Sequence, residues 1–303
     1  MNYTIHQLQI FLEVVRHESI TKASEELFMT QPAVSIQLKK FQDQFSVPLT
    51  EVIGRKLYVT DFGREVAIMA QRVLSEVKEI HYKTKEYEGA LTGVLNISSA
   101  STGKYVIPFF LSDFLKGNAG IDLKLDVTNK SRVIESLKNN EIDFALVSVI
   151  PQDMDFEEEK LVENKLYLVG NHPKANKNMA LIFREPGSAT RKEMETYFKT
   201  REKKRKKLEL TSNEAVKQAV IAGLGYSILP IIGIKNEIQN KNLFILKREN
   251  LPLKTEWRLI WLKGKKLTPV AKAFLHFVRE NKKKILEEHF DWYLNFSESG
   301  MKN

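Results

Sequence analysis

The sequence predicts an α/β protein: a small helical N-terminal domain with one hairpin, then a long helix, then a larger domain of alternating strands and helices. Three observations predict it. Apolar residues recur at helical spacing within the first sixty residues, which end in a β-branched hairpin pattern. Residues 61–88 contain no proline and no glycine beyond Gly63. From Leu91 onward, strand and helix patterns alternate, which is typical of sheets covered by helices.

The composition is that of an ordinary globular protein. The 303 residues are enough for two or three domains with cores of their own, and 43% of them are hydrophobic. The absence of cysteine excludes disulfides, thiol catalysis and Cys-ligated metal sites. The N-terminus lacks a signal-peptide pattern, and no apolar run approaches the roughly 18 residues of a membrane span. We therefore expect a cytoplasmic protein that does not contact a membrane.

The net charge of +9 suggests an anionic partner, but it does not come from the N-terminal part. Residues 1–88 contain 11 Lys and Arg against 12 Asp and Glu, a net charge of −1, so the remainder carries +10. The excess gathers in the runs 199–207, 263–266 and 281–284. Because such runs usually form solvated surface, charge alone does not locate a binding site.

The first sixty residues predict three helices in sequence. The first buries Leu8 and Phe11 on one stripe, and Ser19 is placed to cap the second. A break follows, where the Thr30 side chain can cap a third helix over residues 32–44. Two short helices joined by a tight turn form a helix-turn-helix.

The third helix and the hairpin after it carry the candidate DNA contacts. Gln and Ser side chains can read base edges, while lysines reach phosphates. At the hairpin tip, a wing, Arg55 and Lys56 would reach the backbone or the minor groove. The alternative is a plain three-helix bundle with an incidental hairpin. The residues expected to point outward from the third helix are Gln31, Ala33, Ser35, Gln37 and Lys39, and Lys39 and Lys40 are the lysines expected to reach phosphates.

The stretch LQIFLEVVRHESITKASEELFMTQPAVSIQLKKFQDQFSVPLTEVIGRKLYVTDFG resembles the winged helix-turn-helix of LysR-type transcriptional regulators. The shared pattern is L-x-x-F-x-x-V, S-x-T-x-A, L-x-x-x-Q-P-A-V-S-x-x-[IL] and G-R-x-[LVY]-x-[LV]-T. The resemblance implies a DNA-binding domain over residues 1–60 that binds double-stranded operator DNA with dyad symmetry. It also implies a recognition helix over 32–44 and Arg55 on the wing. The residues that it implies near base edges are Gln31, Pro32, Ala33, Ser35 and Gln37.

Residues 61–89 are expected to form a linker helix that pairs two subunits. Val66, Val73, Ile80 and Tyr87 recur every seven residues, which indicates a packed helix seam. A helix buried in a core would show the same pattern. DNA-reading modules of this kind commonly bind two half-sites as dimers, and the resemblance implies subunit pairing here. We therefore expect a homodimer or a homotetramer.

The alternation after Leu91 predicts a mostly parallel sheet with helices on both faces. One helix is expected over 102–117, and the tail after Lys284 as an extra amphipathic helix packed on the body. The resemblance implies two Rossmann-like lobes, similar to periplasmic solute-binding proteins, with a crossover near Leu161–Lys165 and a return near Trp261–Leu267. The effector-binding domain would then be 90–303, with lobe I at about 90–162 and 266–303 and lobe II at about 163–265.

Polar residues follow three of the predicted strands where the next helix begins. Ligands of such sheets lie at the carboxyl ends of strands, where hydroxyls and helix N-termini can hold an anion. The last of the three segments, 184–191, adds two arginines, which a helix cap does not need. We expect a small anionic metabolite or inorganic oxyanion between the lobes, held by Ser99, Ser101, Thr102, Thr128, Asn129, Ser131, Arg184, Ser188, Thr190 and Arg191.

Helix capping is the alternative explanation for each Ser and Thr in these loops. The resemblance implies that matching positions of the family contact effectors, which favours Ser101, Thr102, Thr128, Ser188 and Thr190.

The sequence therefore predicts a LysR-type regulator that responds to a small anion, with no metal and no cofactor. The six histidines are scattered, and no nucleophile–base pattern stands out. Two alternatives remain: an enzyme acting on a small anion, and a cytoplasmic anion-binding module whose N-terminal domain serves only dimerisation.

Overall fold

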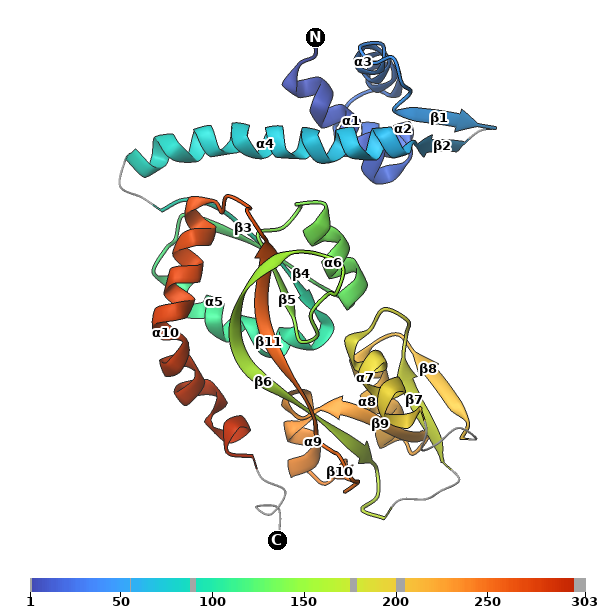
Figure 1. Ribbon diagram of the computed structural model, residues 1–303, viewed down its shortest axis with the longest axis vertical. Coiled ribbons are helices and arrows are strands. Elements are labelled where there is room, and N and C mark those ends of the chain that lie inside the picture. The colour runs from blue at the N-terminus through green and yellow to red at the C-terminus, as the bar shows by residue number, and fades with distance from the viewer. Residues whose placement is uncertain (1, 55, 88–90, 175–178, 200–204, 297–303) are drawn as a thin grey trace. The chain divides into compact units, whose positions relative to one another are not determined.

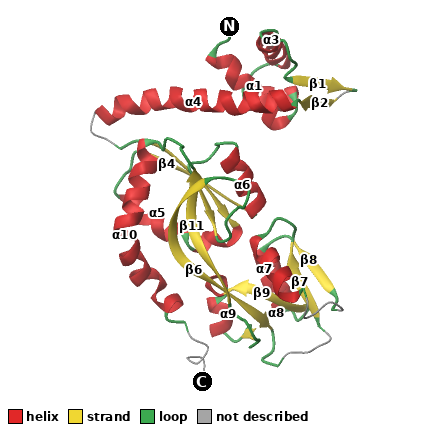
Figure 2. Cartoon of the chain, in the orientation of Figure 1, coloured by secondary structure: helices red, strands yellow, loops and turns green. Residues whose placement is uncertain are grey.

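The computed structural model describes residues 2–54, 56–87, 91–174, 179–199 and 205–296, and it divides the chain into two units. One holds residues 1–90, and the other holds residues 91–138 and 142–303 (Figures 1 and 2). We call them the N-terminal unit and the effector unit and describe each by itself.

The N-terminal unit folds around one aromatic and aliphatic core. Phe11 and Phe41 are fully buried, with ring centroids 5.1 Å apart, and they join α1 to α3. Thr4 and Gln7 form a reciprocal capping box at the start of α1. The elements are α1 (Ile5–His17), α2 (Ile20–Glu26), α3 (Gln31–Gln42), β1 (Thr50–Ile53), β2 (Lys56–Val59) and α4 (Asp61–Tyr87).

Two cap predictions had different outcomes. Ser19 does cap α2, because its side chain accepts a hydrogen bond from the backbone N–H of Lys22 at 3.3 Å. The prediction for Thr30 was wrong: it is the N-cap of α3, but its side chain makes no cap hydrogen bond. Pro32 occupies the second helical position and has no N–H, which removes one of the two usual donors to a cap.

The effector unit is built on a nine-stranded sheet with helices packed against it (Figure 2). Its main strand order is β4-β3-β5-β11-β6-β9-β7-β8, and β10 pairs with β6. The strands are β3 (Gly93–Ala100), β4 (Ile121–Thr128), β5 (Phe144–Val147), β6 (Phe156–Gly170), β7 (Ala180–Arg184), β8 (Lys207–Leu210), β9 (Gly225–Pro230), β10 (Phe244–Ile245) and β11 (Leu253–Leu262). The helices are the 3₁₀ turns η1 (Ser101–Tyr105) and η2 (Ile231–Gly233), and α5 (Ile107–Lys116), α6 (Lys130–Lys138), α7 (Ala189–Phe198), α8 (Asn213–Ile221), α9 (Lys235–Gln239) and α10 (Pro269–Leu294).

Two sets of parallel strands lie on either side of a long antiparallel pair. β3 runs parallel to β4 and β5, and β7 runs parallel to β8 and β9. We call these sets, with the helices that follow their strands, the first and the second lobe. Between them, β6 and β11 pair antiparallel, with a register shift between Trp257 and Arg258. The two-lobed α/β fold class is therefore confirmed, and parallel pairing is confined to the lobes.

The strand that returns from the second lobe to the first is β11, and it pairs with the crossover segment at residues earlier in the sequence than the expected Trp261–Leu267. Residues 162–165 pair with residues 254–257, whereas Trp261 pairs with Glu157. The first half of β6 reads FEEEKLVE, which does not look like a buried strand. It is a strand because its charges are matched across the pair: Glu158 accepts from Arg258 Nη1 at 2.6 Å, and Lys160 lies 3.5 Å from Glu256.

Two helix predictions need correction. The helix expected over 102–117 is divided into η1 and α5 at Val106. Pro108 explains the break, because it has no N–H to continue a helical ladder from the preceding turn. The tail after Lys284 is not an extra helix but the second half of α10, and its Phe290 and Tyr293 are buried against the body as expected.

The end of α10 is fastened to β6 beside the crossover. The Tyr293 hydroxyl donates to the Glu163 carbonyl at 2.6 Å and accepts from the Lys165 N–H at 2.9 Å. The Lys165 ammonium donates to the Leu294 carbonyl at 3.3 Å, near the helix C-terminus, where positive charge is favoured. Burial raises the pKa of Tyr293, so the phenol stays neutral and keeps its donor.

We predict that Tyr293→Phe destabilises the effector unit by about 1–3 kcal/mol, because it leaves two part-buried backbone groups of β6 without their partner. Urea unfolding measures this difference as a shift of the midpoint, provided that the slope of unfolding free energy against urea concentration does not change. Tyr58→Phe, on the half-exposed wing, is the control and should change little. Equal stability of Tyr293→Phe and the unmodified chain would contradict the role assigned to this contact.

Candidate functional site

The outer face of α3 is polar because its apolar residues are used for packing. Val34, Leu38 and Phe41 are buried. Gln31, Pro32, Ser35, Lys39 and Lys40 are exposed, and Ala33 and Gln37 are half-buried. The helix therefore presents hydrogen-bonding side chains at its N-terminus and lysines in its last turn, which is the arrangement expected of a helix that reads base edges.

Gln37 differs from the other candidate readers. The amide Nε2 of Gln7, on α1, donates to the Oε1 of Gln37 at 3.1 Å, and Gln7 is itself buried. This bond occupies the Oε1 of Gln37, so its Nε2 remains as a donor, and it fixes the direction of the side chain. α1 therefore orients a candidate reader, a contact that the sequence pattern did not reveal.

The wing is a hairpin of β1 and β2, with Gly54 in the left-handed region at φ 67°. Lys56 is exposed, and its ammonium lies 5.1 Å from the centre of the Tyr58 ring. Arg55, the other predicted wing cation, lies outside the described residues.

The seam predicted on α4 is exposed in this single chain. Met69 is 61% exposed, Val73 46% and Ile80 70%, while Val66 and Val77 are half-buried. The side chain of Tyr87 lies outside the described residues. An apolar stripe of this extent on one helix is not a core stripe of the N-terminal unit, and it is typical of a surface that another chain covers.

In the effector unit, the loops after β3, β4 and β7 meet. Ser101 Oγ donates to the Thr128 carbonyl at 3.1 Å, and Arg184 Nη2 donates to Ser101 Oγ at 3.3 Å. The second of these bonds connects the second lobe to the first. The Arg184 side chain is only 4% exposed, and it also forms a two-bond pair with Glu185 at 2.7 and 2.8 Å. The structure therefore brings Ser101, Thr128 and Arg184 together.

Arg191 is held in place by its own lobe. Its Nε donates to Glu195 at 2.8 Å, and its Nη1 donates to the Arg184 carbonyl at 2.7 Å and to Glu209. The hydrogen bond with Glu209 raises the pKa of Arg191. Both guanidiniums in the 184–191 segment thus have carboxylate partners, so an anion would compete with Glu185, Glu195 and Glu209 for them.

The remaining predicted residues fall into three settings. Asn129 caps α6 by accepting from the Arg132 N–H at 3.1 Å, and Ser131 Oγ donates to the Gly187 carbonyl at 3.5 Å. Thr102, Ser188 and Thr190 are buried at helix starts. Ser99 is fully buried and donates to the Ala100 carbonyl, so it faces the protein interior.

A cavity of about 600 Å³ lies where the two lobes face each other. Lys130, Ser131 and residues 150–153 line it from the first lobe, and 186–189 and Lys192 from the second. Lys130 Nζ donates to the Ile150 carbonyl at 3.2 Å. Burial, and then the charge of Lys192, lower the pKa of Lys130. An anion here would relieve the repulsion between the two ammonium groups.

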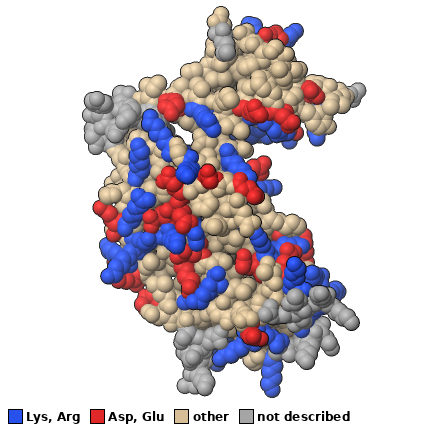
Figure 3. Space-filling view, in the orientation of Figure 1, with Lys and Arg blue, Asp and Glu red and all other residues tan. Residues whose placement is uncertain are grey.

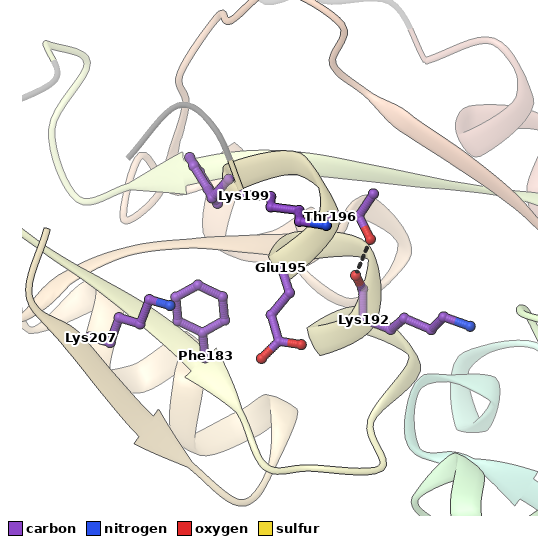
Figure 4. A pocket seen from close by; sticks show the side chains of 7 residues that line it. Phe183, Lys192, Glu195, Thr196, Lys199 and Lys207 are labelled. Atoms are coloured by element: carbon purple, nitrogen blue, oxygen red, sulfur yellow. Dashed lines mark hydrogen bonds between the residues drawn. The ribbon is translucent and has the colours of Figure 1, made fainter. Parts of the chain in front are cut away.

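Lys192 also borders a second cavity, of about 470 Å³, lined by Phe183 and Lys207. Figure 4 shows Lys192 extending away from Phe183 in this view, while Lys207 lies beside the Phe183 ring with its ammonium 5.3 Å from the centre. Thr196, also at this cavity, donates its hydroxyl to the Lys192 carbonyl at 2.9 Å.

Sequence reasoning missed Asn213. It follows β8 at the start of α8, is 8% exposed, and its Oδ1 is buried with no hydrogen-bond partner in the described part of the chain. A buried, unsatisfied amide at the carboxyl end of a lobe strand is a candidate ligand group. The signal was present as Ser212-Asn213 between a strand and a helix, the same chemistry as the three loops that were identified.

Comparison with known proteins places this fold in a family. The model described as "Bacterial regulatory helix-turn-helix protein, lysR family" matches residues 5–64, and "LysR substrate binding domain" matches residues 88–283. The chain is 36% identical over 289 residues to the transcriptional activator CmpR of Synechocystis, covering 91% of this chain and 95% of that protein. It is 35% identical over 290 residues to the RuBisCO operon transcriptional regulator of Allochromatium vinosum, covering 92% and 96%.

A solved structure also matches: the CcmR regulatory domain of Synechocystis PCC6803 in complex with 2-PG. It is 32% identical, with a TM-score of 0.58, and covers 63% of this chain and 98% of that chain.

A DNA-reading N-terminal unit and a two-lobed effector unit define a ligand-responsive transcriptional regulator. The chain belongs to the LysR family of DNA-binding transcriptional regulators. The relatives named above are regulators, which argues against the enzyme and the dimerisation-only alternatives. Within the described residues, no helix combines the length and the apolar character needed to cross a membrane.

Proposed function

We propose that the chain is a cytoplasmic regulator that reads an operator with dyad symmetry through α3 and responds to a small anion bound between its lobes. The observation that carries the first part is the outer face of α3, where Gln31 and Ser35 are exposed above a buried Val34–Leu38–Phe41 stripe. A rigidly packed helix with exposed amide and hydroxyl groups is suited to base-edge reading.

The proposed DNA contacts are of two kinds: side chains that contact base edges, which we call readers, and cations that contact phosphates, which we call clampers. The proposed readers lie in the first turns of α3: Gln31, Pro32, Ala33, Ser35 and Gln37. Lys39, Lys40, Arg55 and Lys56 are the proposed phosphate contacts. Since residues 1–88 carry a net charge of −1, affinity depends on these few cations and on having two copies of them. The exposed apolar stripe on α4 supports a dimer, and a tetramer would add a further contact between dimers.

The proposed effector is a small anionic metabolite or an inorganic oxyanion. The loops that contain Ser101, Thr102, Thr128, Ser188 and Thr190 lie at carboxyl ends of lobe strands, where anions bind. The complex of the related CcmR domain with 2-PG supports an anion of this size. Lys130 and Lys192 add positive charge to the cavity between the lobes. The proposed domain bounds stay at 1–60, 61–89 and 90–303.

Replacing a reader should differ from replacing a clamper. Gln31→Ala is expected to lower the preference for the operator over random DNA by roughly 1–3 kcal/mol, as for a lost bidentate contact. Lys56→Ala should weaken all DNA about equally and reduce the slope of log affinity against log salt by about 0.9 per contact. Gel-shift titration at several salt concentrations measures both. Lys263→Ala, exposed in the effector unit, is the charge-matched control.

The opposite division, with Gln31→Ala weakening all DNA and Lys56→Ala changing sequence preference, would contradict the assignment.

The effector response should depend on hydroxyls at the lobe interface. Thr102→Ala and Ser188→Ala are each expected to abolish any change in operator affinity caused by 2-PG while leaving operator affinity without ligand unaltered, because neither residue is in the N-terminal unit. Thr196→Ala, an exposed hydroxyl on α7, is the matched control. A full response to 2-PG in both variants would refute the placement of the site.

A further inference from the structure

Phe28 is the most exposed large apolar side chain of the described residues. It is 99% exposed and has a positive φ of 52°. Because this ring stays in water, it contributes no burial free energy to the fold. A residue other than glycine in the left-handed region is also strained. For both reasons, phenylalanine at this position does not stabilise the folded chain without DNA.

The backbone at this position does not require an aromatic residue. The Met29 N–H donates to the Ser24 carbonyl at 2.9 Å, and the Phe28 N–H donates to the Glu25 carbonyl at 3.2 Å. These two bonds form the Schellman motif that ends α2, with Phe28 at the left-handed position. Glycine and asparagine are the residues that suit that position, since both adopt a positive φ readily.

The surroundings of Phe28 indicate what covers it. Phe28 lies in the turn between α2 and α3, three residues before Gln31, and Thr30, Gln31 and Pro32 are exposed as well. Ile36, one helical turn beyond Pro32, is 55% exposed. Polar candidate readers thus alternate with apolar side chains at the N-terminal end of α3. In a helix-turn-helix, this end of the second helix contacts bases in the major groove.

We propose that Phe28 is a further specificity-determining residue, whose ring contacts the C5 methyl group of a thymine at the edge of each operator half-site. This inference rests on the proposed reading of DNA by α3. The thymine methyl is the apolar feature of the major groove, and aromatic side chains are suited to contact it. The contact buries the ring only when operator is bound, so the cost of exposing Phe28 is recovered on the correct sequence.

The experiment uses the full-length protein and an operator selected by that protein from random DNA. Each thymine of the half-site is replaced in turn by deoxyuridine, which removes only the methyl group. At one position, this replacement should weaken binding by about fourfold per half-site, which corresponds to the free energy of burying one methyl group. Phe28→Asn should bind the thymine operator about as weakly as the unmodified protein binds the deoxyuridine operator. Deoxyuridine at that one position should not weaken its binding further, whereas deoxyuridine elsewhere should act as it does on the unmodified protein. Leu224→Ala, an exposed apolar residue of the effector unit, is the control and should behave like the unmodified chain.

Phe28→Asn also separates binding from folding. Asparagine suits the left-handed conformation, so the melting temperature should be unchanged or higher while operator affinity falls. Three results would overturn the proposal: unaltered operator affinity in Phe28→Asn, equal sensitivity of both proteins to the same deoxyuridine, or an altered oligomeric state in sedimentation, which would indicate that Phe28 contacts protein. Failure to select any operator would instead refute the proposed reading of DNA by α3.

Discussion

The antiparallel pairing of β6 with β11 is the constraint on which the effector unit depends. These strands carry the chain from the first lobe to the second and back, and β5 and β9, one from each lobe, pair with them directly. Asn164 Nδ2 donates to Thr255 Oγ1 at 2.9 Å across the pair, and Tyr293 fastens α10 to β6 beside it. The result is a narrow two-strand connection with a lobe on each side, and the polar loops of both lobes meet beside it.

Charge has a different role in each part of the chain. In the N-terminal unit, whose net charge is −1 over residues 1–88, the proposed attraction to DNA depends on a few cations on α3 and the wing. In the effector unit, much of the basic excess is paired: on α10, Arg279 and Lys282 contact Glu159 at 3.0 and 2.6 Å. Figure 3 shows acidic and basic side chains interspersed on this surface. The run 281–284 is therefore solvated and partly ion-paired surface, whereas Lys130 and Lys192 line the cavity.

Local patterns predicted those parts of the fold that local physics determines. Helical periodicity placed α1 and α3, and the alternation of patterns after Leu91 indicated a sheet covered by helices. The first half of β6 could not be predicted in this way, because its many charges are stabilised by partners on β11 about a hundred residues away. The same limit applies to the site. Ser101 and Arg184 could be identified from their loops, but their contact, and the carboxylates that occupy Arg184 and Arg191, depend on the folded arrangement.

A regulator of the proposed kind responds because an anion between its lobes changes their separation, and a ligand shifts only states that it binds differently. Because the chain has no cysteine, spin labels at Gln152→Cys and Thr196→Cys, exposed positions on opposite lobes, report that separation directly. We expect saturating 2-PG to shift the distance distribution between the labels and to change operator affinity over the same concentration range. An unchanged distribution while 2-PG still alters operator affinity would contradict this expectation.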